Sequence, residues 1–105
     1  MSESTYEGTV GTKVVDPRGN TIGKVADVLY DDQTLEPRWV AVNLGVLHRH
    51  RPLVPLEETY VSEEGHLVIP FSAAAVKHAP GAQGTTPTAS EANEVARYYG
   101  LPEGN

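Results

Sequence analysis

The chain has 105 residues, which suits one small domain, and its lack of cysteine excludes disulfides, thiolate metal sites and a cysteine nucleophile. The 14 acidic residues outnumber the 8 basic ones, and a net charge of -6 disfavours nucleic acid, whose affinity comes largely from phosphate neutralisation. No apolar run approaches the roughly 20 residues of a membrane span, and residues 1–9 do not resemble a signal peptide. We therefore expect no membrane contact and a cytoplasmic location.

The amino-terminal part of the sequence predicts a disordered leader followed by a β-rich domain. Residues 1–9 are polar, and the folded domain is expected over residues 10–80. Within it, short β-type runs alternate with turn signals, which is typical of a sandwich or barrel. The first run is residues 12–15, and the Pro, Gly and Asn of residues 16–20 then predict a reversal of the chain.

The second run, residues 21–30, is long, and both of its alternating faces are partly apolar. This pattern predicts strong bending, with Gly23 as a bulge or a point of close approach. Where the bent strand loses its ladder, we expect the Asp27 carboxylate to accept backbone N–H bonds. Long bent strands are what the closure of a small barrel requires.

The third run, residues 38–44, alternates cleanly, so that Val40, Val42 and Leu44 are expected to face the core and Trp39 the opposite side. Two prolines make residues 52–56 an edge or an interrupted strand. Residues 59–61 and 67–71 form a hairpin around a Gly-containing connection, and the inward set of its second strand is Leu67, Ile69 and Phe71.

The carboxyl-terminal part predicts two short helical segments. Ser72 is expected to cap a single turn before Pro80, and residues 81–89 form a flexible linker rich in Gly, Thr, Pro and Ala. Ser90 is then the expected N-cap of a short helix over residues 90–101, whose apolar stripe is Ala92, Val95 and Tyr99. A helix this short does not persist alone in water, so it must dock on its own barrel, on a second subunit or on another protein.

Together these elements predict an all-β fold, namely a small antiparallel barrel of about five to six strands with a short carboxyl-terminal helical tail. The chain lacks the sequence motifs of nucleophile elbows, phosphate loops, dinucleotide sites and zinc proteases. A small barrel is also filled by its own side chains. We therefore expect neither an enzyme nor a cofactor.

Three groups of residues are candidate interaction sites. His48 and His50 lie on one side of an extended segment, as metal ligands do, but Arg49 and Arg51 repel a cation. Because this is the one basic cluster of an acidic chain, it favours a solvated tip or recognition of an anionic or acidic partner over a metal site.

The other two groups are aromatic. Trp39 either anchors an exposed interface or fills a second core layer. Tyr98 and Tyr99 of the tail either dock on the parent barrel or a second copy, or recognise another protein as a helix in a groove.

Residues 11–80 resemble the PRC-barrel family, to which the photosynthetic reaction-centre H subunit and the carboxyl-terminal domain of the ribosome maturation factor belong. The resemblance is carried by the segments GTKVVD (residues 11–16), GNTIGKVADV (19–28), LVPL (53–56) and AAVKHAP (74–80). The tail also looks like the short acidic helix that follows this barrel in some bacterial proteins. The resemblance implies a small antiparallel barrel used for protein–protein contact, often as a homodimer, without catalytic residues. The chain contains neither the transmembrane helix of the H subunit nor the RNA-associated domain of the maturation factor.

The sequence therefore predicts a non-enzymatic protein–protein interaction module, a cytoplasmic PRC-barrel adaptor that associates with itself. Strand edges, Trp39 and the tail aromatics are its expected contacts. Two other functions stay open: a factor associated with ribosomes or RNA processing, and a barrel that senses a small ligand or metal.

Overall fold

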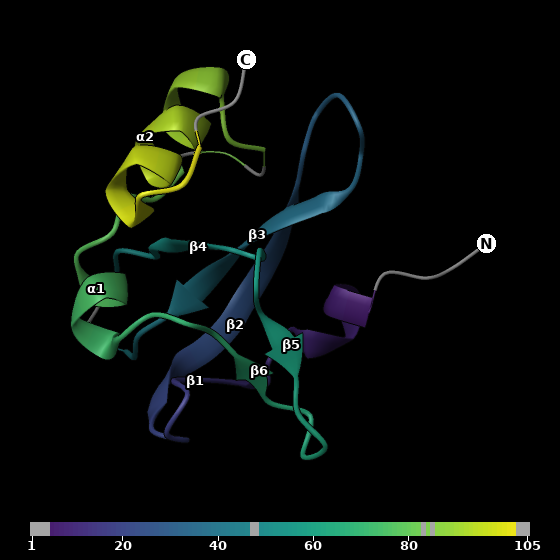
Figure 1. The fold of residues 1–105 in the computed structure, drawn as a ribbon. Helices are drawn as coiled ribbons and strands as arrows, with labels where there is room; N and C mark the ends of the chain where they lie inside the picture. The colour runs from purple at the N-terminus through teal and green to yellow at the C-terminus, as the bar shows by residue number, and fades with distance from the viewer. Residues whose placement is uncertain (1–4, 47–48, 83, 85, 103–105) are drawn as a thin grey trace.

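A computed structural model describes residues 5–46, 49–82, 84 and 86–102 (Figure 1). A 3-10 helix, η1 (Thr5–Thr9), precedes the strands, and two α-helices follow them. The elements in chain order after η1 are β1 (Lys13–Val15), β2 (Thr21–Tyr30), β3 (Pro37–Asn43), β4 (Leu53–Pro55), β5 (Tyr60–Val61), β6 (Leu67–Val68), α1 (Ala73–Lys77) and α2 (Ala89–Tyr99). Within the described residues no helix is long and apolar enough to cross a membrane.

The strands form one sheet in the order β4-β3-β2-β1-β6-β5. Every neighbouring pair is antiparallel except β1 and β6, which are parallel, with Val14 opposite Leu67 and Val15 opposite Val68. The prediction of a purely antiparallel barrel is therefore wrong in this respect. Among the described residues no ladder joins the outermost strands β4 and β5, so the hydrogen-bonded order is open.

The connection between β4 and β5 explains both the parallel pair and the rolled shape of the sheet. By the pairing directions β4 and β5 run the same way, so the chain crosses from one end of the strand order to the other instead of making a hairpin. Residues 56–59 make this crossing through a tight turn in which the Thr59 N–H donates to the Leu56 carbonyl at 3.1 Å. A connection this short requires the two ends of the strand order to lie close together. The sheet is therefore curled like a barrel without a closing ladder.

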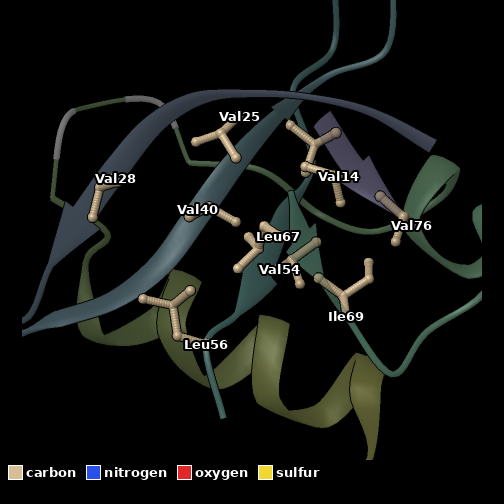
Figure 2. Packing of buried hydrophobic residues seen from close by; sticks show 10 residues of the cluster. Val14, Val25, Val28, Val40, Val54, Leu56, Leu67, Ile69 and Val76 are labelled. Atoms are coloured by element: carbon tan, nitrogen blue, oxygen red, sulfur yellow. The ribbon is translucent and has the colours of Figure 1, made fainter. Parts of the chain in front are cut away.

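The main hydrophobic core lies inside this rolled sheet, where side chains from the strands and α1 point toward one another (Figure 2). Val40 and Val42 are fully buried there and Leu44 packs against this core, as their alternation predicts. The inward set of the last run is confirmed too, because Leu67 and Ile69 are in the core and Phe71 packs against it. The buried members are Val14, Val25, Val28, Val40, Val42, Val54, Leu56, Leu67, Ile69 and Val76.

Strand β2 bends by the two devices that the sequence predicts. A Cβ on Gly23 would lie 2.5 Å from the backbone oxygen of Asn43, so only glycine allows the close approach of β2 and β3. Farther along, the register shifts between Val25 and Asp27. At this point Asp27 Oδ1 accepts the Val28 N–H at 2.9 Å, which replaces the interrupted ladder.

The amino-terminal segment is more ordered than the sequence predicts. Residues 1–4 of the predicted leader lie outside the described residues, but residues 5–9 form η1 and are not a disordered leader. Tyr6 packs against the main core, and Thr9 is 3% exposed. The Gly11 N–H also donates to the Val25 carbonyl at 2.8 Å, which ties this segment to β2.

The two helical segments form where the sequence predicts them, with one difference at a helix start. Ser72 caps α1 by accepting the Ala75 N–H, as expected. Helix α2 is capped by Thr88 and not by Ser90, because Thr88 and Glu91 form a reciprocal capping box. In the predicted linker, the described residues Ala82 and Pro87 are partly or fully buried, so parts of it pack on the fold.

Candidate interaction surface

A second, smaller core lies on the outer face of the sheet, between strands β2 to β4 and helix α2. Its buried members are Leu29, Trp39, Ala41, Leu53 and Val95. Trp39 is 6% exposed here, with the Arg38 guanidinium 5.3 Å from the centre of its ring. Of the two interpretations of Trp39, the exposed interface anchor is therefore wrong for this chain, and the second core layer describes its position.

Helix α2 docks on its own subunit through the adjacent tyrosines. The Tyr99 ring packs 4.3 Å from that of Phe71, and its hydroxyl donates to the Leu53 carbonyl at 2.8 Å. Tyr98 is 42% exposed and points elsewhere, since its hydroxyl donates to the Ala75 carbonyl of α1 at 2.6 Å. Burial, assisted by the neighbouring Tyr98, raises the pKa of Tyr99 above its ordinary value. The two tail aromatics thus fix α2 to β4 and α1.

The same docking covers the outer edge of β4. The Leu53 N–H donates to the Pro80 carbonyl at 3.0 Å, while the Leu53 carbonyl accepts the Tyr99 hydroxyl. Pro55, the last residue of β4, has no N–H to offer. An edge whose polar groups are satisfied in this way does not readily add another strand. The expected contact through exposed strand edges therefore has little support at β4.

A groove opens where α1, α2 and the segment before β4 meet. Its described lining residues are His50, His78, Ala79, Pro80, Glu94, Arg97 and Tyr98. His50 Nε2 lies 2.6 Å from the Ala79 carbonyl oxygen. Because a carbonyl only accepts, this ring nitrogen carries the proton and donates. The bond holds His50, in the segment before β4, against Ala79, which follows α1, and both residues line the groove.

Exposed basic residues flank the lining histidines of this groove in the sequence. Arg49 and Arg51 are exposed on either side of His50, and Lys77 is exposed beside His78 at the end of α1. Arg97 of α2 belongs to the opposite wall. We call this set, with the two imidazoles, the basic surface: Arg49, His50, Arg51, Lys77, His78 and Arg97. His48, the other residue of the sequence-predicted cluster, lies outside the described residues.

Sequence reasoning found only the part of the basic surface in residues 49–51. Lys77, His78 and Arg97 join it because α1 and α2 pack beside the segment before β4. No local pattern near these three residues signals that placement. In the part of the chain that the structure describes, no three His, Cys, Asp or Glu side chains are placed to hold a metal ion.

A second groove lies at the other flank of α2, by the β2–β3 connection, and carries acidic residues. Asp31, Asp32 and Glu57 are among its lining residues, with Trp39 and the start of α2. Asp31 organises the connection: its Oδ1 accepts the N–H groups of Gln33 at 2.8 Å and Thr34 at 3.0 Å, and its Oδ2 pairs with Arg38 at 2.9 Å. The bonds from the Thr34 and Gln33 N–H groups, with Arg38, lower the pKa of Asp31. The groove at this flank of α2 is therefore acidic, while basic residues lie in and next to the groove at the other flank.

Comparison with known proteins gives one result for the folded body. The family model of the PRC-barrel domain matches residues 1–76. The matched residues include η1 and all six strands and end within α1, before α2 begins. No curated protein matches the chain.

Proposed function

The chain belongs to the PRC-barrel family, and we propose that it is a non-enzymatic protein–protein interaction module that binds an acidic segment of a partner protein at the basic surface. The proposed contact lies at the groove where α1, α2 and the segment before β4 meet. It does not use the buried Trp39 or the covered edge of β4.

The observation that carries the proposal is the distribution of charge. The chain has 8 Lys and Arg residues against 14 Asp and Glu. Arg97 lines the groove, and three more of these basic residues, Arg49, Arg51 and Lys77, are exposed and directly adjacent in sequence to its lining histidines. Among the described lining residues of that groove, Glu94 is the one carboxylate. A positive patch on a negative protein attracts an anionic partner and orients its approach.

The groove fits a peptide segment better than a nucleic acid. The partly exposed Pro80 and Tyr98 give it apolar contact area beside the charges, which is the usual combination at a protein interface. Nucleic acid instead requires a basic surface that follows a run of phosphates. An acidic peptide with an apolar or aromatic residue matches both properties of the groove.

Fluorescence anisotropy with a labelled oligoglutamate peptide that carries one central Tyr tests the proposal. We expect saturable binding that weakens as salt rises from about 50 to 500 mM, because screening shortens the reach of exposed charges. The double variant Arg49→Glu/Arg51→Glu should weaken binding about tenfold or more, which corresponds to at least about 1.4 kcal/mol. Its matched control is Lys13→Glu/Arg18→Glu, which gives the same net charge by reversing exposed residues elsewhere.

The remaining outcomes contradict the proposal in distinct ways. Equal weakening by the two double variants means that net charge alone, and not the basic surface, attracts the peptide. A single-stranded RNA of equal charge that binds more tightly than the peptide assigns the surface to nucleic acid. If the unaltered chain does not bind the peptide at low salt, the proposal of an acidic partner is refuted.

A further inference from the structure

We propose that the basic surface takes up protons when it binds an acidic segment, so that its affinity for the segment rises as the pH falls from about 8 to about 6. The groups responsible are the imidazoles of His50 and His78, which both line the groove. Imidazole is the side chain that ordinarily changes its charge between pH 5 and 8. The inference rests on the proposed function and adds the regulation of the same site by pH.

The hydrogen bond of His50 decides which of its ring nitrogens takes up the proton. Nε2 lies 2.6 Å from the Ala79 carbonyl oxygen, and because a carbonyl only accepts, Nε2 already carries a proton in the neutral ring. The second proton therefore binds at Nδ1. Both nitrogens of an imidazolium donate, so the bond to Ala79 persists after protonation. The positive charge is gained without loss of the contact that positions the ring.

The backbone that follows α1 lies close against the His50 ring. A Cβ on Gly81 would be 3.3 Å from His50 Cε1 and 2.7 Å from the backbone oxygen of Arg51. His50 is nevertheless exposed. An exposed ring held in place by backbone contacts loses little conformational entropy when a ligand carboxylate pairs with it. The structure thus presents a titrating group to the ligand in a fixed position.

His78 adds a second imidazole just after α1. It is exposed and directly precedes Ala79, whose carbonyl accepts the bond from His50. Lysine, arginine, glutamate and tyrosine side chains ordinarily change charge outside the range of pH 6 to 8. These are the types of the other charged or titratable residues that line the groove or flank its histidines in the sequence: Arg49, Arg51, Lys77, Glu94, Arg97 and Tyr98. Among the described residues of this surface, the two imidazoles therefore determine how its charge changes with pH.

The binding of a carboxylate and the binding of a proton strengthen each other at this surface. A ligand carboxylate favours the charged form of an imidazole beside it, so the complex holds more protons than the free protein. By linkage, the affinity then rises as the pH falls through the range in which the imidazoles become charged. An exposed ion pair changes a binding constant by up to about fivefold, so two imidazoles together should contribute about threefold to tenfold.

Fluorescence anisotropy with a labelled oligoaspartate peptide, acetylated at its amino terminus and carrying one central Tyr, measures this dependence. The titrations are done at pH 6.0, 7.0 and 8.0 at constant ionic strength, with a dye that does not itself titrate in this range. Aspartate is chosen because its carboxyl ordinarily titrates near pH 4, so the charge of the peptide stays constant. We expect the unaltered chain to bind at least about threefold more tightly at pH 6.0 than at pH 8.0.

The double variant His50→Gln/His78→Gln should bind the peptide with nearly the same affinity at all three pH values. The glutamine amide at position 50 can still donate to the Ala79 carbonyl, so the variant removes the titration and keeps the donor. The matched control is His66→Gln, between β5 and β6, which removes a histidine that is not among the described lining residues of the groove. It should keep the full pH dependence.

The outcomes separate this inference from the proposed function. Equal affinities of the unaltered chain at pH 6.0 and pH 8.0 overturn the proton uptake and leave the binding of an acidic segment standing. A pH dependence that persists in His50→Gln/His78→Gln, or that disappears in His66→Gln, also overturns it, because the protons then bind elsewhere. If the peptide does not bind at any of the three pH values, the proposed function fails and the proton uptake fails with it.

Discussion

Replacing Trp39 by Ala should remove a large part of the stability of this protein. The side chain is 6% exposed between the sheet and α2. An aromatic side chain buries about 150–250 Å², which at about 25 cal/mol per Å² corresponds to roughly 4–6 kcal/mol. Because Ala retains the Cβ atom and the neighbours relax in part, we expect a loss of about 3–5 kcal/mol. Domains of this size are stable by only about 5–15 kcal/mol, so the loss is between roughly a fifth and the whole of that stability.

Urea unfolding followed by far-ultraviolet circular dichroism measures this loss without the tryptophan signal. Tyr60→Ala is the matched control, because Tyr60 is an aromatic residue of the same sheet but is 60% exposed. It should lose less than about 1 kcal/mol. If Trp39→Ala is as stable as this control but no longer associates, Trp39 is an exposed interface anchor and not part of a second core layer.

Three further substitutions test separate parts of the structure. Gly23→Ala should destabilise the protein by about 1–3 kcal/mol in the same urea assay, because the added Cβ would lie 2.5 Å from the backbone oxygen of Asn43. An unchanged urea midpoint would contradict the close approach of β2 and β3. Thr88→Ala should lower the free energy of unfolding by about 1 kcal/mol because it removes the N-cap of α2, while Ser90→Ala should leave it unchanged. A larger loss from Ser90→Ala than from Thr88→Ala would mean that Ser90 is the N-cap. Burial raises the pKa of Tyr99, so its contribution to stability is complete below the ordinary tyrosine value of 10.0 and falls as pH rises above it. Thermal melts from pH 8 to 11 should therefore show an alkaline loss that Tyr99→Phe reduces and Tyr60→Phe does not.

The longer strands were predictable from β-type runs bounded by turn residues and, in residues 38–44, from clean alternation. The predicted run of residues 21–30 coincides with β2, and the parity of Val40 and Val42 places them in the main core. The parallel pairing of β1 with β6 was not predictable, because β6 has two residues and no period that could indicate a direction. The direction follows from the crossing at residues 56–59, which is a property of the whole sheet.

At the tail the local signals competed. Both Thr88 and Ser90 are good N-cap residues, and the Thr-x-x-Glu pattern of a capping box ending at Glu91 distinguishes them. Adjacent helical residues point about 100° apart. Tyr99 therefore continues the stripe of Val95 into the second core, while Tyr98 reaches α1.

The candidate site was half predictable. The run of residues 49–51 is visible as a basic cluster in an acidic sequence. Lys77 and Arg97 come near it only through the docking of α1 and α2, which depends on contacts such as the bond from Tyr98 to Ala75. Such contacts join residues far apart in the chain and leave no local pattern.

Mapping the acidic peptide on the protein by nuclear magnetic resonance tests the central claim most directly. The amide signals of residues 49–51, 77–79 and 94–98 should shift together and saturate with one peptide per chain, while those of residues 31–36 stay in place. Shifts confined to residues 31–36, or spread evenly over the sheet, would contradict a partner site built by the docking of α2 beside α1.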